Sequence, residues 1–362
     1  MFNKKRIPKI RIIIAILIGF GVSGCSSTSE LIKQTSSDKT VDTDYSIIYY
    51  IHADSDYLYH DSNGNPVLGN SQILNTAHKV AENAKSGEVF IFYQQPVKKF
   101  LGLFPRKTSH LYYYSKGELS NVVLYRHANK NENFLTTEAQ LFFQYGNQFQ
   151  YDQQKLQFLY FGHEIPLNDG KKYHLTLPEI DVNIESFSNG IAKFLTGEGQ
   201  RFDLVVLSTC NNGSPAMANS LLPITDTLLA SPQNLHLSHI DTGSLNDLES
   251  DSEISSNQIA QSMAEQTYNR LDSEILTTIT LAVYDFKTIK DYREDLERFI
   301  VSYEQLDPIS YYSDNIDCNR VDFFDNELFR AGVNSWYKPA RFGRRSLTDG
   351  HSGWGCRPFI EE

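Results

Sequence analysis

From residue 45 onwards, the chain alternates between short apolar runs and longer amphipathic stretches. Runs rich in β-branched and aromatic residues predict buried strands at 45–51, 88–93, 156–161, 202–207 and 277–283. Apolar residues at helical spacing predict helices at 70–87, 136–145, 184–195, 216–229, 257–275 and 287–301. Strands that alternate with helices are typical of an α/β fold with a mainly parallel central sheet flanked by helices.

Three shorter segments complete this pattern. The stretches 110–114 and 121–126 alternate around Lys116-Gly117, which predicts a hairpin, and 235–240 is expected to be a short strand. The acidic, Ser-rich stretch 245–257 is expected to be a mobile surface loop. No Gly-rich phosphate-binding loop follows any predicted strand, and no serine-hydrolase G-x-S-x-G motif is present.

Composition restricts the partners of this domain. The chain has 362 residues, of which 40% are hydrophobic, enough for a sizeable core. It carries 33 basic and 44 acidic side chains, a net charge of −11. Residues 1–24 hold five of the basic and none of the acidic ones, so the remainder has 28 against 44, or −16. Nucleic acid is therefore not an expected partner, because its phosphates would be repelled.

The N-terminus has the pattern of a targeting segment. A basic stretch (1–11) precedes an apolar run (12–22) that is too short to span a bilayer but suits a signal peptide. Val22-Ser23-Gly24-Cys25 resembles the bacterial lipobox, which implies cleavage before Cys25, lipidation of Cys25 and attachment to a membrane. Ser26 at the next position favours the outer membrane of a Gram-negative envelope. The alternative is a plain secretory signal or a short anchor.

These patterns divide the chain into four parts. Residues 1–24 are a predicted signal peptide, and the polar, Ser/Thr-rich stretch 25–44 is a predicted flexible tether. Residues 45–305 form the predicted α/β domain, and 306–362 are a C-terminal extension expected to pack on it.

Cys210, Cys318 and Cys356 remain if Cys25 is lipidated. In an oxidising compartment this odd number means that one cysteine pairs outside the chain, binds metal or stays free. Cys318 and Cys356 can pair across a loop of about 38 residues. Cys210 would then be the single unpaired thiol.

Two predicted core strands end in reactive side chains. His163 follows the strand at 156–161, and Cys210 follows the strand at 202–207. If these strands are parallel neighbours, both side chains emerge at the same edge of the sheet, where an imidazole can take the proton of an attacking thiol. Backbone N–H groups beside Cys210 could then stabilise an oxyanion. The structural alternative is an inert buried cysteine and a core histidine.

Four segments resemble the clostripain-like cysteine peptidases in order and spacing: IIYYIHADSDYL (47–58), FDLVVLSTC (202–210), LLASP (228–232) and ITLAVYD (279–285). The resemblance covers roughly residues 45–300. It implies a caspase-like sandwich, with Cys210 as nucleophile and His163 as general base. It also implies a protein or peptide substrate, and family members often cleave after Arg or Lys and process themselves.

The sequence departs from this family at functional positions. The family has Gly after the catalytic histidine, where its N–H helps to form the oxyanion hole, and this chain has Glu164. The family often has Asp two residues before the cysteine, and this chain has Ser208. Asp241 is a candidate for the negative floor of a pocket that binds a basic side chain. A second hypothesis follows, in which a catalytically degenerate member acts as a binding or scaffold lipoprotein.

The remaining polar clusters favour structural roles. His52, Asp54 and Asp56 alternate in a way that suits a Ca²⁺ or Zn²⁺ site, but the acids are expected to cap the adjacent loop, so no cofactor is expected. His239 lies in the predicted strand beside the proposed pocket, and we expect it to have a packing or surface role.

Overall fold

The computed structural model describes residues 43–356, apart from 54–57, 61–64, 96–98, 101–103, 106–108, 128–132, 147–153, 169–179, 181, 198, 236–238, 252, 307–315 and 343–349. The predicted signal peptide, the tether up to residue 42, Cys25, Asp54 and Asp56 lie outside this set. Within it, no helix combines the length and the hydropathy needed to cross a membrane.

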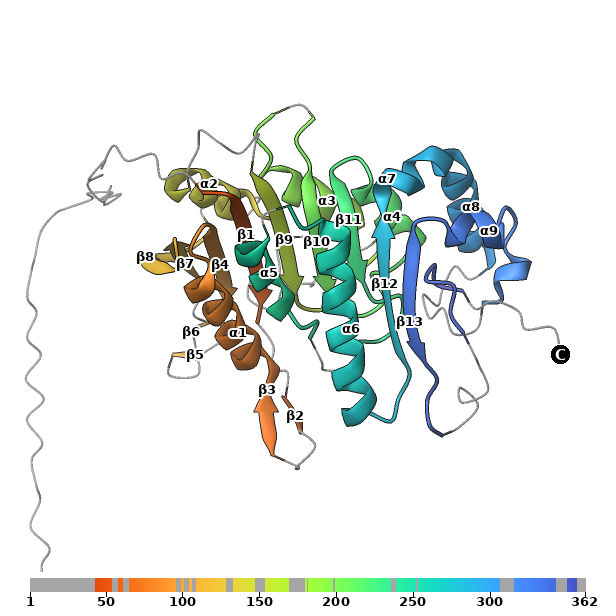
Figure 1. Ribbon diagram of the computed structural model, residues 1–362, viewed down its shortest axis with the longest axis horizontal. Coiled ribbons are helices and arrows are strands. Elements are labelled where there is room, and N and C mark those ends of the chain that lie inside the picture. The colour runs from red at the N-terminus through yellow and green to blue at the C-terminus, as the bar shows by residue number, and fades with distance from the viewer. Residues whose placement is uncertain are drawn as a thin grey trace, which may run out of the picture. The chain divides into compact units, whose positions relative to one another are not determined.

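A nine-stranded mixed sheet forms the centre of the fold, in the order β13-β12-β11-β10-β9-β1-β4-β7-β8 (Figure 1). The five central strands are parallel: β11 (Thr225–Ala230), β10 (Phe202–Ser208), β9 (Lys155–Phe161), β1 (Tyr45–His52) and β4 (Glu88–Gln94). Antiparallel strands extend each side: β7 (Ser109–Ser115) and β8 (Glu118–Tyr125), and β12 (Ile279–Asp285) and β13 (Val333–Lys338). The predicted α/β fold with a mainly parallel sheet is confirmed.

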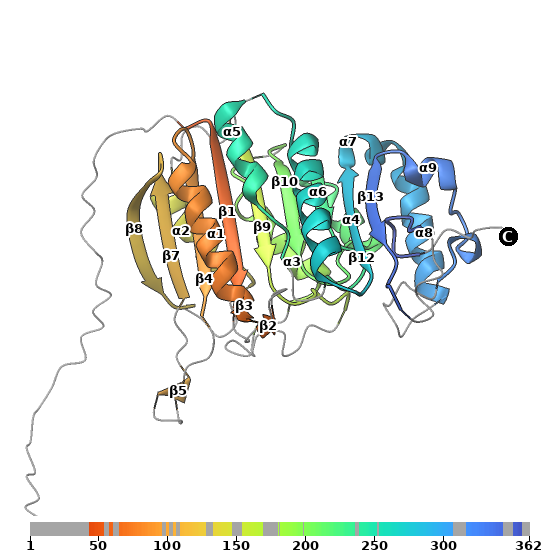
Figure 2. The ribbon, with the colours of Figure 1, turned by 60° about the horizontal axis from the view of Figure 1, so that its bottom comes forward.

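Helices cover both faces of the sheet (Figure 2). One face packs against α1 (Gly69–Asn83), α5 (Asp247–Ser250) and α6 (Ser256–Glu274). The other packs against α2 (Thr136–Tyr145), α3 (Ile184–Ala192), α4 (Pro215–Leu221) and α8 (Arg293–Leu306). Every residue of β1 is therefore buried: Ile48 and Tyr50 face one core, and Ile47, Tyr49 and Ile51 face the other. This explains why β1 is a continuous apolar run rather than an alternating one.

The smaller elements complete the chain. They are β2 (Leu58–His60), β3 (Pro66–Leu68), β5 (Lys99–Phe100), β6 (Phe104–Pro105), α7 (Phe286–Ile289), α9 (Asn326–Arg330) and 3₁₀ turns at Gly243–Asn246, Lys290–Tyr292 and Cys318–Arg320. The predicted hairpin is the pair β7–β8, whose turn residues Lys116 and Gly117 both have positive φ, at 52° and 76°. Such a turn matches the twist of the two strands it connects.

The predicted helix at 216–229 is wrong in its second half. The helix α4 ends at Leu221, and the chain enters β11 at Thr225. Pro223 cannot supply the N–H that a continuing helix needs, and the short apolar run after it fits a strand between β10 and β12 equally well. Residues 236–238 of the short strand predicted at 235–240 lie outside the described residues, and the described residues on either side of them are not in a strand.

The loop predicted at 245–257 is more ordered than its acidic composition suggested. Leu245 and Leu248 are each 1% exposed and pack in the same core as α1 and α6. The carboxylate of Glu249 accepts hydrogen bonds from the Ser86 backbone N–H (2.9 Å) and from the Tyr45 hydroxyl. The expectation of a mobile surface loop is therefore wrong for this part of the segment.

The C-terminal extension joins the sheet. Its strand β13 pairs antiparallel with β12 and forms one edge. Cys318 and Cys356, whose pairing the sequence left open, form a disulfide with a Cα–Cα distance of 5.1 Å. Nearby, the Trp354 indole is fully buried and donates to the Phe329 carbonyl at 2.7 Å. The extension is thus attached to the domain by strand pairing and core packing, and the disulfide closes a loop within the extension itself.

Candidate active site

The two reactive side chains predicted from sequence lie at one edge of the sheet. β9 and β10 are parallel neighbours, and Phe161 pairs with Ser208 at their carboxyl ends. His163 lies two residues after Phe161, and Cys210 lies two residues after Ser208. The loops that follow β9 and β10 therefore carry both side chains just beyond the same edge of the sheet. His163 is exposed and Cys210 is half-buried, and both therefore have access to solvent.

A cavity of about 330 Å³ opens where these loops leave the sheet. His163 and Cys210 both line it. Its other described lining residues come from the start of α1, the ends of β9 and β10, and the segment after β11: Gly69, Asn70, Ile73, Phe161, Gly162, Ser208, Thr209, Leu235 and His239. A concave, mostly apolar site with a few polar groups is the usual form of a ligand pocket.

Close packing around Gly162 shapes the loop before His163. A Cβ atom at position 162 would lie 2.6 Å from the Tyr160 hydroxyl oxygen and 3.0 Å from the His52 Cβ. Only glycine, which has no Cβ atom, lets the backbone come this close to the side chains of Tyr160 and His52. The rings of His52 and His163 meet edge to face, with centroids 6.4 Å apart. His52 itself is buried, with its Nδ1 3.3 Å from the Tyr160 hydroxyl.

The surroundings of Cys210 favour the protonated thiol. Burial raises the pKa of Cys210 above its ordinary value. A hydrogen bond with the Leu235 backbone offsets part of this shift, and the charge of Glu164 adds to it. A thiol with a raised pKa needs a base to become a nucleophile at neutral pH. Two imidazoles, His163 and His239, are among the described residues that line the same cavity, and His163 is the exposed one.

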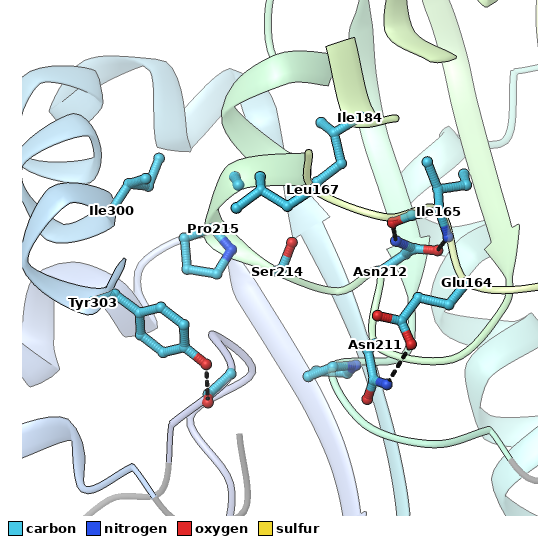
Figure 3. A pocket seen from close by; sticks show the side chains of 13 residues that line it. Glu164, Ile165, Leu167, Ile184, Asn211, Asn212, Ser214, Pro215, Ile300 and Tyr303 are labelled. Atoms are coloured by element: carbon cyan, nitrogen blue, oxygen red, sulfur yellow. Dashed lines mark hydrogen bonds between the residues drawn. The ribbon is translucent and has the colours of Figure 1, made fainter. Parts of the chain in front are cut away.

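Asn212 ties together the two loops that follow β9 and β10, through hydrogen bonds to Ile165 (Figure 3). Its Oδ1 accepts hydrogen bonds from the Ile165 backbone N–H (2.9 Å) and from the Thr209 hydroxyl (2.6 Å). Its Nδ2 donates to the Ile165 carbonyl at 2.9 Å. Asn212 is 1% exposed, so these bonds are shielded from water. The side chain continues the pairing of β9 with β10 beyond the ends of both strands.

A second bond between the loops involves the residues directly after His163 and Cys210. The Asn211 Nδ2 donates to the Glu164 carboxylate at 2.7 Å, as Figure 3 shows. Asn211 has a φ of 55°, in the left-handed region that asparagine tolerates better than most residues. Burial raises the pKa of the Glu164 carboxyl, and the bond from Asn211 offsets part of this shift.

Glu164 lines a second, smaller cavity of about 40 Å³ and is not among the described residues that line the first. This second cavity lies between the two loops and α8, where Ile300 and Tyr303 form an apolar wall (Figure 3). The carboxylate acts on the thiol through its charge, while its bond to Asn211 turns it towards the second cavity.

The two predicted substrate-binding residues differ in their surroundings. Ser208 lines the first cavity, and its Oγ accepts a hydrogen bond from the Ile240 backbone N–H at 2.9 Å. Asp241 is not among the described residues that line this cavity, and its carboxylate lies 2.9 Å from the Arg270 guanidinium. Its charge is thus balanced by Arg270, which does not suit the floor of a pocket for basic side chains.

The sequence did not identify Asn70 as a residue that lines the cavity, or Asn211 and Asn212 as residues that connect the two loops. For His239 it predicted a packing or surface role. The asparagines give a weak signal, because Asn at a strand end usually caps or turns the chain. Among the described residues, no group of three or more His, Cys, Asp or Glu side chains is placed to hold a metal ion. Cys210 is the free cysteine of the described residues.

Comparison with known proteins finds likeness at the level of structure. No protein-family model and no curated protein matches the sequence. A secreted C11 cysteine protease from Bacteroides thetaiotaomicron, iotapain, is similar with a TM-score of 0.56 and 11% identity, over 88% of this chain and 94% of that one. An inactive zymogen C11 protease from Parabacteroides distasonis gives 0.55 and 12%, over 86% and 91%.

A third similar structure is a secreted C11 cysteine protease from Bacteroides thetaiotaomicron in complex with an irreversible peptide inhibitor. Its TM-score is 0.51 and its sequence identity 12%, and the match covers 82% of this chain and 85% of that one. At these identities, the likeness shows a shared fold. The chain therefore has the caspase-like fold of C11, clostripain-family cysteine proteases.

Proposed function

We propose that this protein is a cysteine endopeptidase of the clostripain type, with Cys210 as nucleophile and His163 as general base. One observation carries the proposal: adjacent parallel strands bring a half-buried thiol and an exposed imidazole to one edge of the sheet, where both line the same cavity. Two further findings support it, namely the fold shared with C11 proteases and the peptide inhibitor bound to one of them.

In the proposed reaction, His163 takes the thiol proton as the Cys210 sulfur attacks the carbonyl carbon of the scissile peptide bond. The oxyanion that forms accepts hydrogen bonds from backbone N–H groups of Cys210 and Glu164. Collapse of this intermediate breaks the C–N bond, and the proton on His163 passes to the leaving amine. Water, deprotonated by His163, then hydrolyses the thioester and frees Cys210.

Covalent labelling tests this assignment. The purified chain should react with a peptidyl halomethyl ketone, and the added mass should lie on the tryptic peptide that contains Cys210. Cys210→Ala should abolish both labelling and peptide cleavage, and His163→Gln should reduce both strongly. His78→Gln is a matched control, because His78 is half-buried on α1, bonded to the Tyr114 hydroxyl (2.8 Å) and outside the cavity. Full cleavage by the Cys210→Ala variant would exclude the proposed nucleophile.

The alternative is a catalytically degenerate protein that binds a partner through the same fold. The raised pKa of Cys210 and the carboxylate of Glu164 beside it favour this alternative, because both oppose formation of a thiolate or an oxyanion. It predicts that the purified protein stays unlabelled by peptide electrophiles between pH 6 and pH 9, while small thiol reagents still reach Cys210.

We propose a lipid anchor at Cys25 and a location in the bacterial envelope, at the outer membrane. The support is the lipobox-like sequence and the polar tether that follows it. Detergent phase partitioning of the protein expressed in a Gram-negative cell tests the anchor. The natural chain should enter the detergent phase, and Cys25→Ser should remain in the aqueous phase. Equal partitioning of both would contradict the anchor.

A further inference from the structure

Charge is unevenly distributed along the chain. Residues 69–126, from the start of α1 to just past β8, carry eight basic and three acidic side chains, or +5. The remainder of the chain after residue 24 carries 20 basic and 41 acidic side chains, or −21. Residues 69–126 build the end of the sheet that consists of β4, β7 and β8 (Figure 2). One end of an acidic protein is therefore basic, which favours an anionic partner there.

The exposed side chains at this end show the same asymmetry. Among the described residues, four basic side chains are exposed: Lys79, Lys85, Lys116 and Arg126. Two acidic ones are exposed, Glu82 and Glu118, whereas the third acid of the segment, Glu88, is buried. The ammonium group of Lys85 lies against Gly117, in the turn that connects β7 and β8. Basic groups thus gather at the start of β8, and Arg126 directly follows its end.

Three aliphatic side chains of β8 are exposed between these basic groups. They are Leu119 (49% exposed), Val122 (55%) and Leu124 (60%). Strict alternation along a strand would place Leu119 on the opposite face from the other two. The β-bulge at Ser120, where the pairing with β7 shifts by one residue, brings Leu119 to the same face. We call these three residues the β8 strip.

The β8 strip lies on the α1 face of the sheet. Leu119 pairs with Tyr114 of β7, and side chains directly opposite each other in an antiparallel pair share a face. The Tyr114 hydroxyl is 2.8 Å from the Nδ1 of His78, which belongs to α1. Figure 2 shows β8 at the end of the sheet, beyond this helix. The strip is therefore a row of exposed aliphatic side chains on one face of an edge strand.

A row of aliphatic side chains with basic groups at both ends suits the surface of a membrane. Apolar side chains there enter the boundary between headgroups and acyl chains, while Lys and Arg lie beside anionic phosphates. A second copy of the chain fits this surface less well, because two copies would bring an excess of like charges together. An anionic lipid surface satisfies both the charge and the apolar side chains.

The proposed anchor would make even a weak contact of this kind effective. The stretch from Cys25 to Asp44 has 20 residues. A flexible chain of that length has an end-to-end distance of roughly 25 Å. A domain held so close to the bilayer has a high effective concentration at its surface. The anchor limits the distance, and a second contact is needed to fix the orientation of the domain.

We infer that the β8 strip rests on an anionic lipid surface, with its aliphatic side chains at the level of the headgroups. The basic groups at its two ends, Lys85 and Lys116 at one and Arg126 at the other, lie beside lipid phosphates. This contact orients the anchored domain with the β8 end of the sheet towards the bilayer. It does not depend on the peptidase function.

Cosedimentation with vesicles tests the inference. The chain from residue 25 onwards, with Cys25→Ser, lacks both the apolar run 12–22 and the lipidation site, and it contains every described residue. We expect it to bind vesicles of equal phosphatidylglycerol and phosphatidylcholine at least tenfold more tightly than phosphatidylcholine alone, and less tightly as salt is raised. Equal binding to both vesicles, or binding to neither, would overturn the inference. Labelling of Cys210 reports on the peptidase proposal separately.

Two matched triple variants test the basic groups. The first carries Lys85→Gln, Lys116→Gln and Arg126→Gln. The second makes the same change in charge at the other end of the sheet, in exposed residues of the α7–α8 segment: Lys287→Gln, Lys290→Gln and Arg298→Gln. Each basic group near an anionic surface contributes a factor of about five, so the first variant should bind about a hundredfold more weakly. An equal loss in both variants, or no loss in the first, would overturn the assignment to this surface.

A third variant tests the aliphatic side chains. It carries Leu119→Thr, Val122→Thr and Leu124→Thr, since Thr suits a strand and circular dichroism can confirm the fold. Vesicle binding should fall about tenfold, whereas Leu276→Thr with Val301→Thr, which are 53% and 57% exposed elsewhere, should leave it unchanged. Unchanged binding by the folded third variant would overturn the apolar contact. A dimer that forms without vesicles and is lost in this variant, measured by analytical ultracentrifugation, would assign the strip to a second copy. If the variant fails to fold, the charge variants and the two vesicle types still decide.

Discussion

Replacement of Asn212 by alanine should loosen the two loops that carry His163 and Cys210. The substitution removes the side-chain partners of the N–H and the carbonyl of Ile165, a residue that is 1% exposed. A buried backbone group left unpaired costs about 1–3 kcal/mol. Some water will enter the space left by the amide, so we expect a loss of about 2–4 kcal/mol in the free energy of unfolding.

Urea unfolding, followed by circular dichroism, measures this loss. Asn121→Ala is the matched control, since Asn121 is exposed on the edge strand β8 and should change stability by less than about 0.5 kcal/mol. Asn212→Asp separates the bonds, because a carboxylate keeps both acceptor bonds but faces the Ile165 carbonyl without a donor. It should therefore also be destabilised.

Activity gives a second measurement of the same effect. If Asn212 positions the reacting groups, kcat of Asn212→Ala should fall by about tenfold to a hundredfold with a smaller change in KM. A purely structural role would lower stability and leave kcat of the folded protein unchanged. An unfolding free energy within about 0.5 kcal/mol of the parent would refute the reasoning altogether, since it would mean that the bonds of Asn212 do not hold the loops.

Three further predictions follow from charge and covalent structure. Glu164→Gln removes a negative charge that raises the pKa of Cys210, so the pH profile of its alkylation by iodoacetamide should move to lower pH. Replacement of both Cys318 and Cys356 by Ser opens a loop of 38 residues and should cost about 3–4 kcal/mol in urea unfolding. Burial lowers the pKa of His239 to about 4, against 6.5 for an unperturbed histidine, so the unfolded chain binds the extra proton between these values. Stability should therefore fall as pH drops from about 6.5 to 4, and less so in His239→Leu.

Each of these three predictions has an outcome that would contradict it. An unshifted profile in Glu164→Gln, with Glu185→Gln as control on α3, would mean that the carboxylate does not act on the thiol. Unfolding of the double serine variant at the parental urea concentration would show that the disulfide does not contribute to stability. An equal loss of stability at acid pH in the parent and in His239→Leu would assign that loss to other groups.

The strands of the sheet were predictable where both faces are buried. The runs that became β1, β9 and β10 are rich in apolar residues on both faces, with single polar interruptions at Ser46, Gln157 and Asp203, as expected of strands covered on both sides. The run that became β11 is apolar only over its last three residues, 228–230, and it follows α4 so closely that the sequence predicts one continuous helix. A short apolar run has no periodicity that separates the two, and only the vacant position beside β10 decides between them.

The candidate pair was predictable because strand ends in parallel sheets meet at one edge. The connecting groups were not, because they depend on contacts distant in sequence. Asn212 is defined by its bonds to Ile165, 47 residues away, and Asp241 by its pairing with Arg270, 29 residues away. The place of His239 in the lining of the cavity was not predictable for the same reason.

The pairing of β9 with β10 also divides the sheet by sequence. All strands on the β9 side, out to β8, come from residues before 162, and all strands on the β10 side, out to β13, come from residues after 201. The imidazole thus belongs to the N-terminal half and the thiol to the C-terminal half. A backbone cut between residues 170 and 179 would leave each half with its own complete set of strands. Two separately expressed fragments would have to associate along this seam before His163 and Cys210 could line one cavity.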